Sequence, residues 1–337
     1  QWGPYSDLGG IYQGKAIEGG PEQIMNSASI PREDYRELAR SLDPKHYDPS
    51  ELVNFAKDSG FKSIVMTAKF NDGFSLFDSR HSDFDAVDVI PAKRDLLKEF
   101  SEACKKSGIP LGYYYAIGTD WFHPGGYAHS RMENADVSTR KKYLESVALP
   151  QIDELVTDYG PVAQIIFDSL DSVPPEISSR LRGKLGSRIV CPSDFVRSPG
   201  DYRFTGEATI GTNYTGQDWE RVLLTGDSLG FRQGKVNWKS GETIVRELVS
   251  TSSQGGNLLL HVALDGDGRI PAAAAAALKT AGEWLRLNGE SIYGTERTPF
   301  PTLAWEGGAT TRENEGGGHK LYIHLFKHPG ENLVLRN

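Results

Sequence analysis

The residue of this sequence that most suggests chemistry is Asp168, within the stretch 164–170 (Q-I-I-F-D-S-L). The apolar residues before it predict a short buried strand. Burying an unpaired charge costs several kcal/mol, so a carboxylate where a strand leaves a sheet is a candidate catalytic group. The alternative is a solvated aspartate that opens a loop or caps the following helix.

Aromatic and acidic residues also follow other predicted strands. They include Lys69 to Phe74, then Asp120 and Trp121, and later Asp194, Asp201, Glu207, Trp219, Glu220 and Asp227. Aromatic rings stack on the apolar face of a sugar, polar groups orient its hydroxyls, and a pair of carboxylates cleaves a glycosidic bond. This pattern suggests a sugar site, although loops that merely pack against a barrel can have the same composition.

Alternating strands and helices would position these residues. Strands are predicted at 63–67, 111–116, 164–168, 188–191 and 255–262, and helices at 48–56, 94–107, 139–159, 175–185, 242–252 and 271–287. Such alternation predicts βαβ units and a parallel sheet, and its repetition favours a closed barrel. We therefore predict the α/β class, with a TIM-like (β/α) barrel over residues 1–296. The opening residues, 1–12, are expected to form a first strand that leads into a loop.

The last part of the chain has a different composition. Residues 310–337 are rich in glycine and charge and contain one predicted strand at 321–326. One strand cannot close a sandwich. We predict that residues 297–337 begin a small β-sandwich-like region, which either packs against the barrel or lacks a part.

Composition narrows the functional classes. The net charge of −8 argues against a nucleic-acid partner, and no run approaches the length needed to span a membrane. The two cysteines give no disulfide framework, and no His, Cys or Asp spacing predicts a metal site, so we expect no cofactor. The expected partner is an oligosaccharide or polysaccharide. The chain begins at Gln1 rather than Met, which leaves secretion or periplasmic export open.

Several long blocks identify a family. The stretches 68–85 (A-K-F-N-D-G-F-S-L-F-D-S-R-H-S-D-F-D), 111–121 (L-G-Y-Y-Y-A-I-G-T-D-W), 165–169 (I-I-F-D-S) and 253–262 (S-Q-G-G-N-L-L-L-H-V) resemble the family 29 glycoside hydrolases, the α-L-fucosidases. The resemblance implies a (β/α) barrel followed by a β-sandwich, and a retaining mechanism through a covalent glycosyl-enzyme. It places Asp168 at the family's nucleophile.

The same resemblance suggests the acid/base residue. Residues 200–207 (G-D-Y-R-F-T-G-E) are similar to the loop that carries the family's catalytic glutamate, which favours Glu207. Glu220 is the competitor, unless it is a loop carboxylate paired with Arg221 or Arg232. A proton donor needs a raised pKa near neutral pH.

The sequence departs from the family pattern where the sugar is bound. The family's His-His pair is Phe70-Asn71 here, its early H-W-G motif is assigned to Asp7-Leu8-Gly9, and its Glu-Trp pair is Glu22-Gln23. The arginine expected near Ser193 is not evident. Because a site built to hydrogen-bond one sugar discriminates against others, these changes favour an altered specificity.

We therefore predict a retaining exo-glycosidase that releases a terminal α-linked fucose or fucose-like sugar. Asp168 and Glu207 are its expected catalytic residues, and four further residues are expected to line the sugar site: Glu22, Asn71, Tyr115 and Trp121. Two alternatives stay open. One is the same mechanism on a different, substituted sugar, and the other is a catalytically silent carbohydrate-binding protein.

Overall fold

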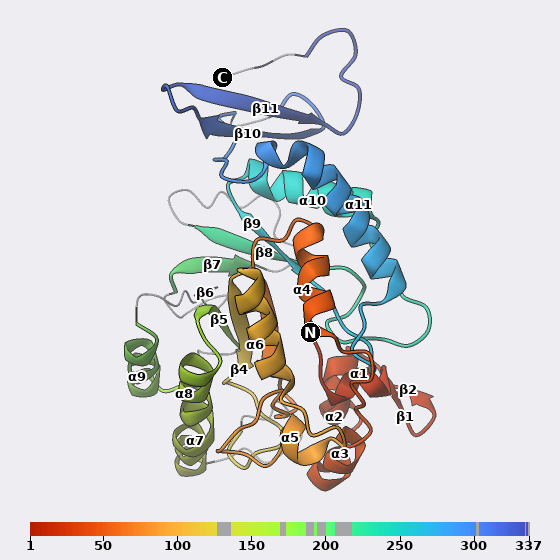
Figure 1. Cartoon of the computed structure of the whole chain (residues 1–337), viewed down its shortest axis with the longest axis vertical. Helices are drawn as coiled ribbons and strands as arrows, with labels where there is room; N and C mark the ends of the chain where they lie inside the picture. Colours follow the sequence, from red (N-terminus) through yellow and green to blue (C-terminus); the bar gives the residue numbers. More distant parts are fainter. Residues whose placement is uncertain are drawn as a thin grey trace.

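The computed structural model describes residues 1–126, 136–168, 173–186, 192–193, 200–205, 218–300, 303–333 and 335 (Figure 1). No helix within these ranges is long and apolar enough to cross a membrane.

Two parallel sheets form the body of the molecule. One contains β3 (Ile64–Lys69), β4 (Leu111–Ala116) and β5 (Val162–Asp168), and the other contains β6 (Pro192–Ser193), β7 (Tyr202–Thr205), β8 (Trp219–Leu224) and β9 (Asn257–His261). Neighbouring strands follow chain order and run parallel, and β5 lies against β6. Within each sheet, the carboxyl ends of the strands therefore lie at the same edge. The predicted βαβ organisation is confirmed.

The helices before, between and after these strands begin and end close to their predicted limits. They are α4 (Pro49–Asp58), α6 (Leu96–Ser107), α7 (Val137–Tyr143), η2 (Leu144–Ala148), α8 (Leu149–Asp158), α9 (Pro175–Leu185), α10 (Gly241–Ser253) and α11 (Ala272–Asn288). Asp48 caps α4, because its Oδ1 accepts the backbone N–H of Glu51 at 3.0 Å. The helix predicted at 139–159 is divided by the π-helical turn η2, directly before Pro150, which has no N–H to donate.

The strand predicted at the start of the chain is wrong. Residues Pro4–Leu8 form the short helix α1, with proline at its first position and Gly9 ending it in the left-handed conformation (φ 54°). Short elements follow: β1 (Ile11–Tyr12), β2 (Lys15–Ala16), η1 (Pro21–Gln23), α2 (Ile24–Ser27) and α3 (Arg32–Ala39). Together with α5 (Ala86–Val89), the helices among them lie at the opposite end of the molecule from the C-terminal strands (Figure 1).

The C-terminal segment forms an antiparallel pair, β10 (Gly307–Glu313) and β11 (His319–Leu325). Only β11 was predicted, because β10 (G-G-A-T-T-R-E) has almost no hydrophobic residues. β10 packs on α10, where the Ala309 N–H donates to Ser253 Oγ at 3.0 Å. Thr310 Oγ1 also donates to the Ser291 carbonyl, in η4 (Gly289–Ser291), at 2.6 Å. The pair therefore rests on the helices (Figure 1). The domain boundary at residue 296 remains a prediction.

In the part of the chain that the structure describes, β5 and β6 are the edge strands at which the two parallel sheets meet, and β3 and β9 are the edge strands on the far sides. β3 and β9 line a cavity of about 2040 Å³, whose apolar walls include Met66, Leu258 and Leu260. Gln1 lines the same cavity and connects the two strands' ends. Its amino group donates to the Val262 carbonyl at 2.8 Å, and Thr67 Oγ1 donates to its Oε1 at 3.0 Å.

Candidate active site

Asp168 is the last residue of β5, as predicted for a strand-end carboxylate. In the parallel register its Cα pairs with Ala116, the last residue of β4, and Lys69 at the end of β3 pairs with Tyr115. The segment that leaves β4 therefore starts beside the Asp168 backbone, and the segment that leaves β3 starts one strand further away. Glu207 lies outside the described residues, as do Asp194 and Cys191.

Two of the predicted sugar-site residues, Asn71 and Trp121, are brought together here. They leave β3 and β4 respectively, and the Trp121 N–H donates to the Asn71 carbonyl at 2.8 Å. Asn71 Oδ1 and Trp121 Nε1 are both buried without a hydrogen-bond partner among the described residues. An unpaired buried polar group costs about 1–3 kcal/mol. A hydroxyl can donate to the amide oxygen and accept from the indole N–H, so both groups suit a sugar ligand.

Glu22 reaches the same end of the molecule from η1. Glu22 is 5% exposed, and its Oε2 accepts a hydrogen bond from the Gly230 N–H at 2.7 Å. Burial raises the pKa of Glu22, against the opposing effects of backbone hydrogen bonds and Arg232. Burial, Asp72 and Glu22 together raise the pKa of Tyr5, so these three side chains share one electrostatic environment.

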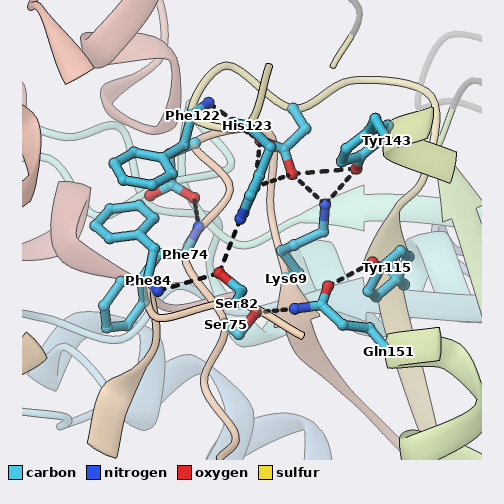
Figure 2. Close-up of polar contacts among 12 residues, drawn as sticks. Lys69, Phe74, Ser75, Ser82, Phe84, Tyr115, Phe122, His123, Tyr143 and Gln151 are labelled. Atoms are coloured by element: carbon cyan, nitrogen blue, oxygen red, sulfur yellow. Dashed lines mark hydrogen bonds and ion pairs between the residues drawn. The ribbon is translucent and has the colours of Figure 1, made fainter. Parts of the chain in front are cut away.

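The two neighbouring tyrosines of β4 have different surroundings. Tyr115 is fully buried, and its hydroxyl donates to Gln151 Oε1 of α8 at 2.7 Å, so this side chain is used within the protein (Figure 2). Successive side chains of a strand point to opposite faces. Tyr114 accordingly lines the large cavity and lies beside Phe70, with ring centroids 5.6 Å apart. The tyrosine of this strand that faces Phe70 is therefore Tyr114.

Phe70 occupies the first position of the changed His-His pair. Its ring is 4% exposed and packs between Tyr114 and Tyr5, whose centroid lies 5.7 Å away. This position therefore presents a hydrocarbon surface where a histidine would present hydrogen-bonding nitrogens.

A buried ion pair that was not predicted from the sequence lies within the segments that carry Asn71 and Trp121. Lys69 Nζ donates to Asp120 Oδ2 at 2.5 Å, and neither side chain is exposed. Tyr143 accepts from Lys69 at 2.7 Å and donates to Asp120 at 3.1 Å, and His123 Nδ1 contacts Asp120 at 2.9 Å (Figure 2). Lysine at the end of an apolar strand was the available signal, since lysine is rarely buried unpaired.

Burial and the neighbouring charges act in opposite directions on the ionisable groups of this ion pair. Burial alone would raise the pKa of Asp120, but the charges of His123 and Lys69 and the hydrogen bonds from His123 hold that pKa well below its usual range. Burial lowers the pKa of Lys69, and Asp120 opposes that effect. His123 Nε2 is also engaged, 2.8 Å from Ser82 Oγ. His123 is thus a partner of Asp120 and Ser82.

Asp72 is a second buried carboxyl group that the sequence analysis did not single out. Tyr35 donates to its Oδ2 at 2.8 Å, and the Phe74 N–H donates to its Oδ1 at 3.2 Å. Burial raises the pKa of Asp72 to about 7. No arginine or lysine hydrogen bond to it is present among the described residues, which distinguishes it from Asp120.

The start of the chain offers a better match to the H-W-G motif than Asp7-Leu8-Gly9. The tripeptide Gln1-Trp2-Gly3 agrees at two of three positions. Trp2 is buried, and a Cβ on Gly3 would lie 2.7 Å from the Tyr5 ring, so glycine is required there. Gln1 Nε2 donates to the Tyr5 hydroxyl at 2.9 Å, which connects this motif to the Phe70 aromatic group.

Glu220 lies far along the strands from Asp168. It is the second residue of β8, and its Oε2 accepts from Tyr202 at 3.0 Å and from Gln164 Nε2 at 3.3 Å. Gln164 precedes Asp168 by four residues of β5, about 13 Å of extended chain. Retaining glycosidases hold their two carboxyl groups about 5–5.5 Å apart. Burial raises the pKa of Glu220, as an acid would require, but its position argues against that role.

Comparison with known proteins gives one consistent match. The family model described as "Alpha-L-fucosidase" matches residues 2–290. Among curated proteins, the chain is similar to the plasma alpha-L-fucosidase of Pongo abelii, with 30% identity over 81% of this chain and 61% of that protein. It is also similar to the alpha-L-fucosidase of Dictyostelium discoideum, with 25% identity over 89% of this chain and 67% of that protein. The chain thus spans about two thirds or less of the length of these relatives.

Solved structures agree. The alpha-L-fucosidase of Vibrio sp. strain EJY3 matches with a TM-score of 0.91 and 29% identity, over 98% of this chain and 60% of that one. Alpha-L-fucosidase AlfC from Lactobacillus casei, solved in complex with its alpha-L-fucose product, matches with a TM-score of 0.79 and 28% identity, over 86% of this chain and 95% of that one.

Proposed function

The chain belongs to the alpha-L-fucosidase family, and we propose that it is a retaining exo-glycosidase that releases a terminal α-linked fucose or fucose-like sugar from a glycan. The observation that carries this proposal is the position of Asp168. It ends β5 at the edge of the sheet from which β3 and β4 also emerge, and the segments that follow those two strands carry Asn71 and Trp121, whose side-chain polar groups have no hydrogen-bond partner among the described residues. A glycan is the substrate class that these groups suit.

In the proposed reaction, the Asp168 carboxylate attacks the anomeric carbon while an acid protonates the departing glycosidic oxygen. The bond from the anomeric carbon to that oxygen breaks, and an ester to Asp168 forms. Glu207 is our proposed acid. It then removes a proton from a water molecule, which attacks the same carbon and releases Asp168. Two inversions give a sugar of retained configuration.

Binding would use the groups nearest to this reaction. We propose that Asn71 and Trp121 hydrogen-bond sugar hydroxyls through Oδ1 and Nε1, and that Glu22 accepts from another hydroxyl through the lone pairs that Gly230 leaves unused. Tyr114 takes the place of Tyr115 in this proposal, because the Tyr115 hydroxyl is bonded to Gln151.

For the architecture, we propose that the two parallel sheets belong to one TIM-like (β/α) barrel over residues 1–296, with 297–337 as the C-terminal β region. Support comes from the strand order, the contact between β5 and β6, and the connection that Gln1 makes between β3 and Val262.

A second candidate function has the same mechanism and a different sugar. Phe70, held between Tyr5 and Tyr114, offers no hydrogen bond where the family has a histidine. Such a wall would favour a deoxy position or an apolar substituent over a free hydroxyl, because a hydroxyl that faces it loses its hydrogen bonds to water.

The test is a panel of 4-nitrophenyl α-glycosides that includes α-L-fucoside and O-methylated or O-acetylated fucosides. ¹H NMR should show the α-anomer as the first-formed sugar. Preference for a substituted fucoside would select the second candidate. Inactivity on the whole panel, together with measurable binding of oligosaccharides, would contradict both and favour a silent carbohydrate-binding protein.

A further inference from the structure

The Lys69–Asp120 ion pair is fully buried, although an ion pair in that position is not needed for a stable fold. Both side chains have zero exposure, and the carboxylate receives hydrogen bonds from Lys69, Tyr143 and His123, and from the Phe122 and His123 N–H groups at 3.0 and 2.9 Å. Removing two charges from water costs several kcal/mol for each, and apolar replacements are often equally stable. Stability alone therefore does not account for this pair.

Its position suggests another role, because each charged residue lies within two residues of a proposed sugar-binding residue. Lys69 precedes Asn71 by two residues, and Asp120 directly precedes Trp121. The Trp121 N–H donates to the Asn71 carbonyl, so a backbone hydrogen bond also joins the two segments. The Lys69–Asp120 bond thus connects the two segments next to their proposed sugar-binding residues.

The packing around Asp120 leaves these segments little freedom. A Cβ on Gly73 would lie 2.6 Å from Asp120 Oδ1, and one on Gly126 would lie 1.8 Å from the Asp120 carbonyl oxygen. Gly73 also has φ of 81°, which favours glycine. Two glycines from different segments therefore allow the backbone to close tightly on this residue.

We propose that Lys69 and Asp120 form a positioning pair for the sugar site, which sets the relative placement of Asn71 Oδ1 and Trp121 Nε1 without touching the sugar. This inference rests on the proposed function. A shift of about 1 Å between two hydrogen-bonding groups weakens the binding of a rigid ring strongly, which is what the pair would prevent.

The experiment neutralises the pair without leaving an unpaired charge, in the double variant Lys69→Met/Asp120→Asn. Its matched control is Arg221→Met/Glu247→Gln. That second ion pair has an N–O distance of 2.7 Å and a nearly buried arginine, and it joins β8 to α10 away from Asn71 and Trp121. Both double variants should have a lower Tm.

The readout is the kinetics on 4-nitrophenyl α-L-fucopyranoside, measured at a temperature where both variants are folded. We expect KM to rise at least fivefold in Lys69→Met/Asp120→Asn and to stay within twofold of wild type in the control. Adding Trp121→Phe should raise KM in the wild type but change it little in the neutralised variant, because the indole there is already misplaced. An unchanged KM, or additive effects of Trp121→Phe, would overturn the proposal.

Failure of the proposed function can be distinguished from failure of this inference. If the wild type cleaves no aryl glycoside, the same variants are compared by the dissociation constant for L-fucose from NMR titration. Selective weakening in Lys69→Met/Asp120→Asn would then support the positioning pair although the hydrolase proposal fails. Equal affinity in both double variants, or a wild type that does not bind L-fucose, would overturn the positioning pair.

Discussion

Two carboxylates in this molecule, one fully buried and one partly buried, have opposite electrostatics. Asp120, past the carboxyl end of β4, receives a lysine, a histidine, a tyrosine and two backbone N–H groups, and its pKa is held low. Glu220, near the amino end of β8, receives Tyr202 and Gln164, and burial raises its pKa. The surroundings of Asp120 therefore stabilise its anionic form, whereas burial makes Glu220 easier to protonate than an ordinary glutamate.

The comparison shows why a raised pKa does not identify a catalytic acid. Glu220 has the electrostatic property that an acid needs, but it lies along the strands far from Asp168. Asp120 lies close to the proposed sugar site, but its lone pairs are engaged by the protein. Position along parallel strands is therefore the stronger criterion, and it leaves Glu207 as our proposed acid.

The largest expected effect distinguishes Asp168, at the carboxyl end of β5, from Glu220, near the amino end of β8. Asp168→Ala should lower turnover of 4-nitrophenyl α-L-fucoside by about 10³-fold or more, because no ester can form. Glu220→Gln should keep turnover within about twofold of wild type. A Glu220→Gln variant as inactive as Asp168→Ala, at unchanged Tm, would break the comparison.

The next effect concerns the acid at the catalytic end. Glu207→Ala should lower turnover by about 10²–10⁴-fold for substrates with poor leaving groups. The loss should be smaller for 4-nitrophenyl fucoside, because 4-nitrophenolate leaves without being protonated. Added azide should restore activity and yield a fucosyl azide, because azide attacks the intermediate without base assistance. An absence of both effects would remove Glu207 from the mechanism.

The third effect is the pH dependence of stability that Asp72 should cause. The pKa of Asp72 is raised to about 7 in the folded protein, above its unfolded value of 3.8, so the folded state binds the extra proton. Its contribution to stability is complete below pH 4 and is lost as pH rises toward 7, by about 1–4 kcal/mol. Asp72→Asn should remove this decline in a series of urea denaturation curves from pH 4 to 8. A slope equal to that of wild type would contradict the assignment.

The smallest effect belongs to Glu220. Its raised pKa has the same sign, so wild type should lose stability as pH rises above the ordinary glutamate value, by about 1 kcal/mol or less given its two hydrogen bonds. Glu220→Gln should flatten this part of the stability profile while activity is retained. The opposite result would be a wild type whose stability rises with pH and a Glu220→Gln variant whose stability does not. It would contradict the prediction, because it would mean that a positive charge pairs with the Glu220 carboxylate.

The sequence was sufficient to predict the alternating strands and helices, because their hydrophobic periodicity and caps are local signals. Pro175–Leu185 and Leu111–Ala116 have their predicted limits. α1 was missed because aromatic residues beside glycine suggested a strand, although Pro4 and Gly9 carry the helix signals. β10 was missed because it is stabilised by contacts with α10 rather than by its own hydrophobic pattern.

The site was only partly predictable for a different reason. Asn71 and Trp121 could be proposed from their places after strands, but the bond between them depends on how two distant segments meet. Tyr114 and Tyr115 are consecutive residues of β4, so their side chains point to opposite faces of the sheet. Because both are tyrosines, the sequence does not indicate which of them faces Phe70. The pairing of Lys69 with Asp120 spans the whole connection from β3 to β4 and leaves no local pattern.

The central claim is that Asp168, at the carboxyl end of β5, forms the covalent bond to the sugar. The most direct test is incubation with 2-deoxy-2-fluoro-α-L-fucosyl fluoride, followed by digestion and tandem mass spectrometry. Fluorine at carbon 2 slows both the formation and the hydrolysis of the glycosyl-enzyme by destabilising their oxocarbenium-like transition states, and the good fluoride leaving group restores its formation, so the intermediate accumulates. We expect time-dependent inactivation with one fluorofucosyl group on the Asp168 carboxylate. A label on another carboxylate, or inactivation-free turnover with an inverted product, would contradict the account.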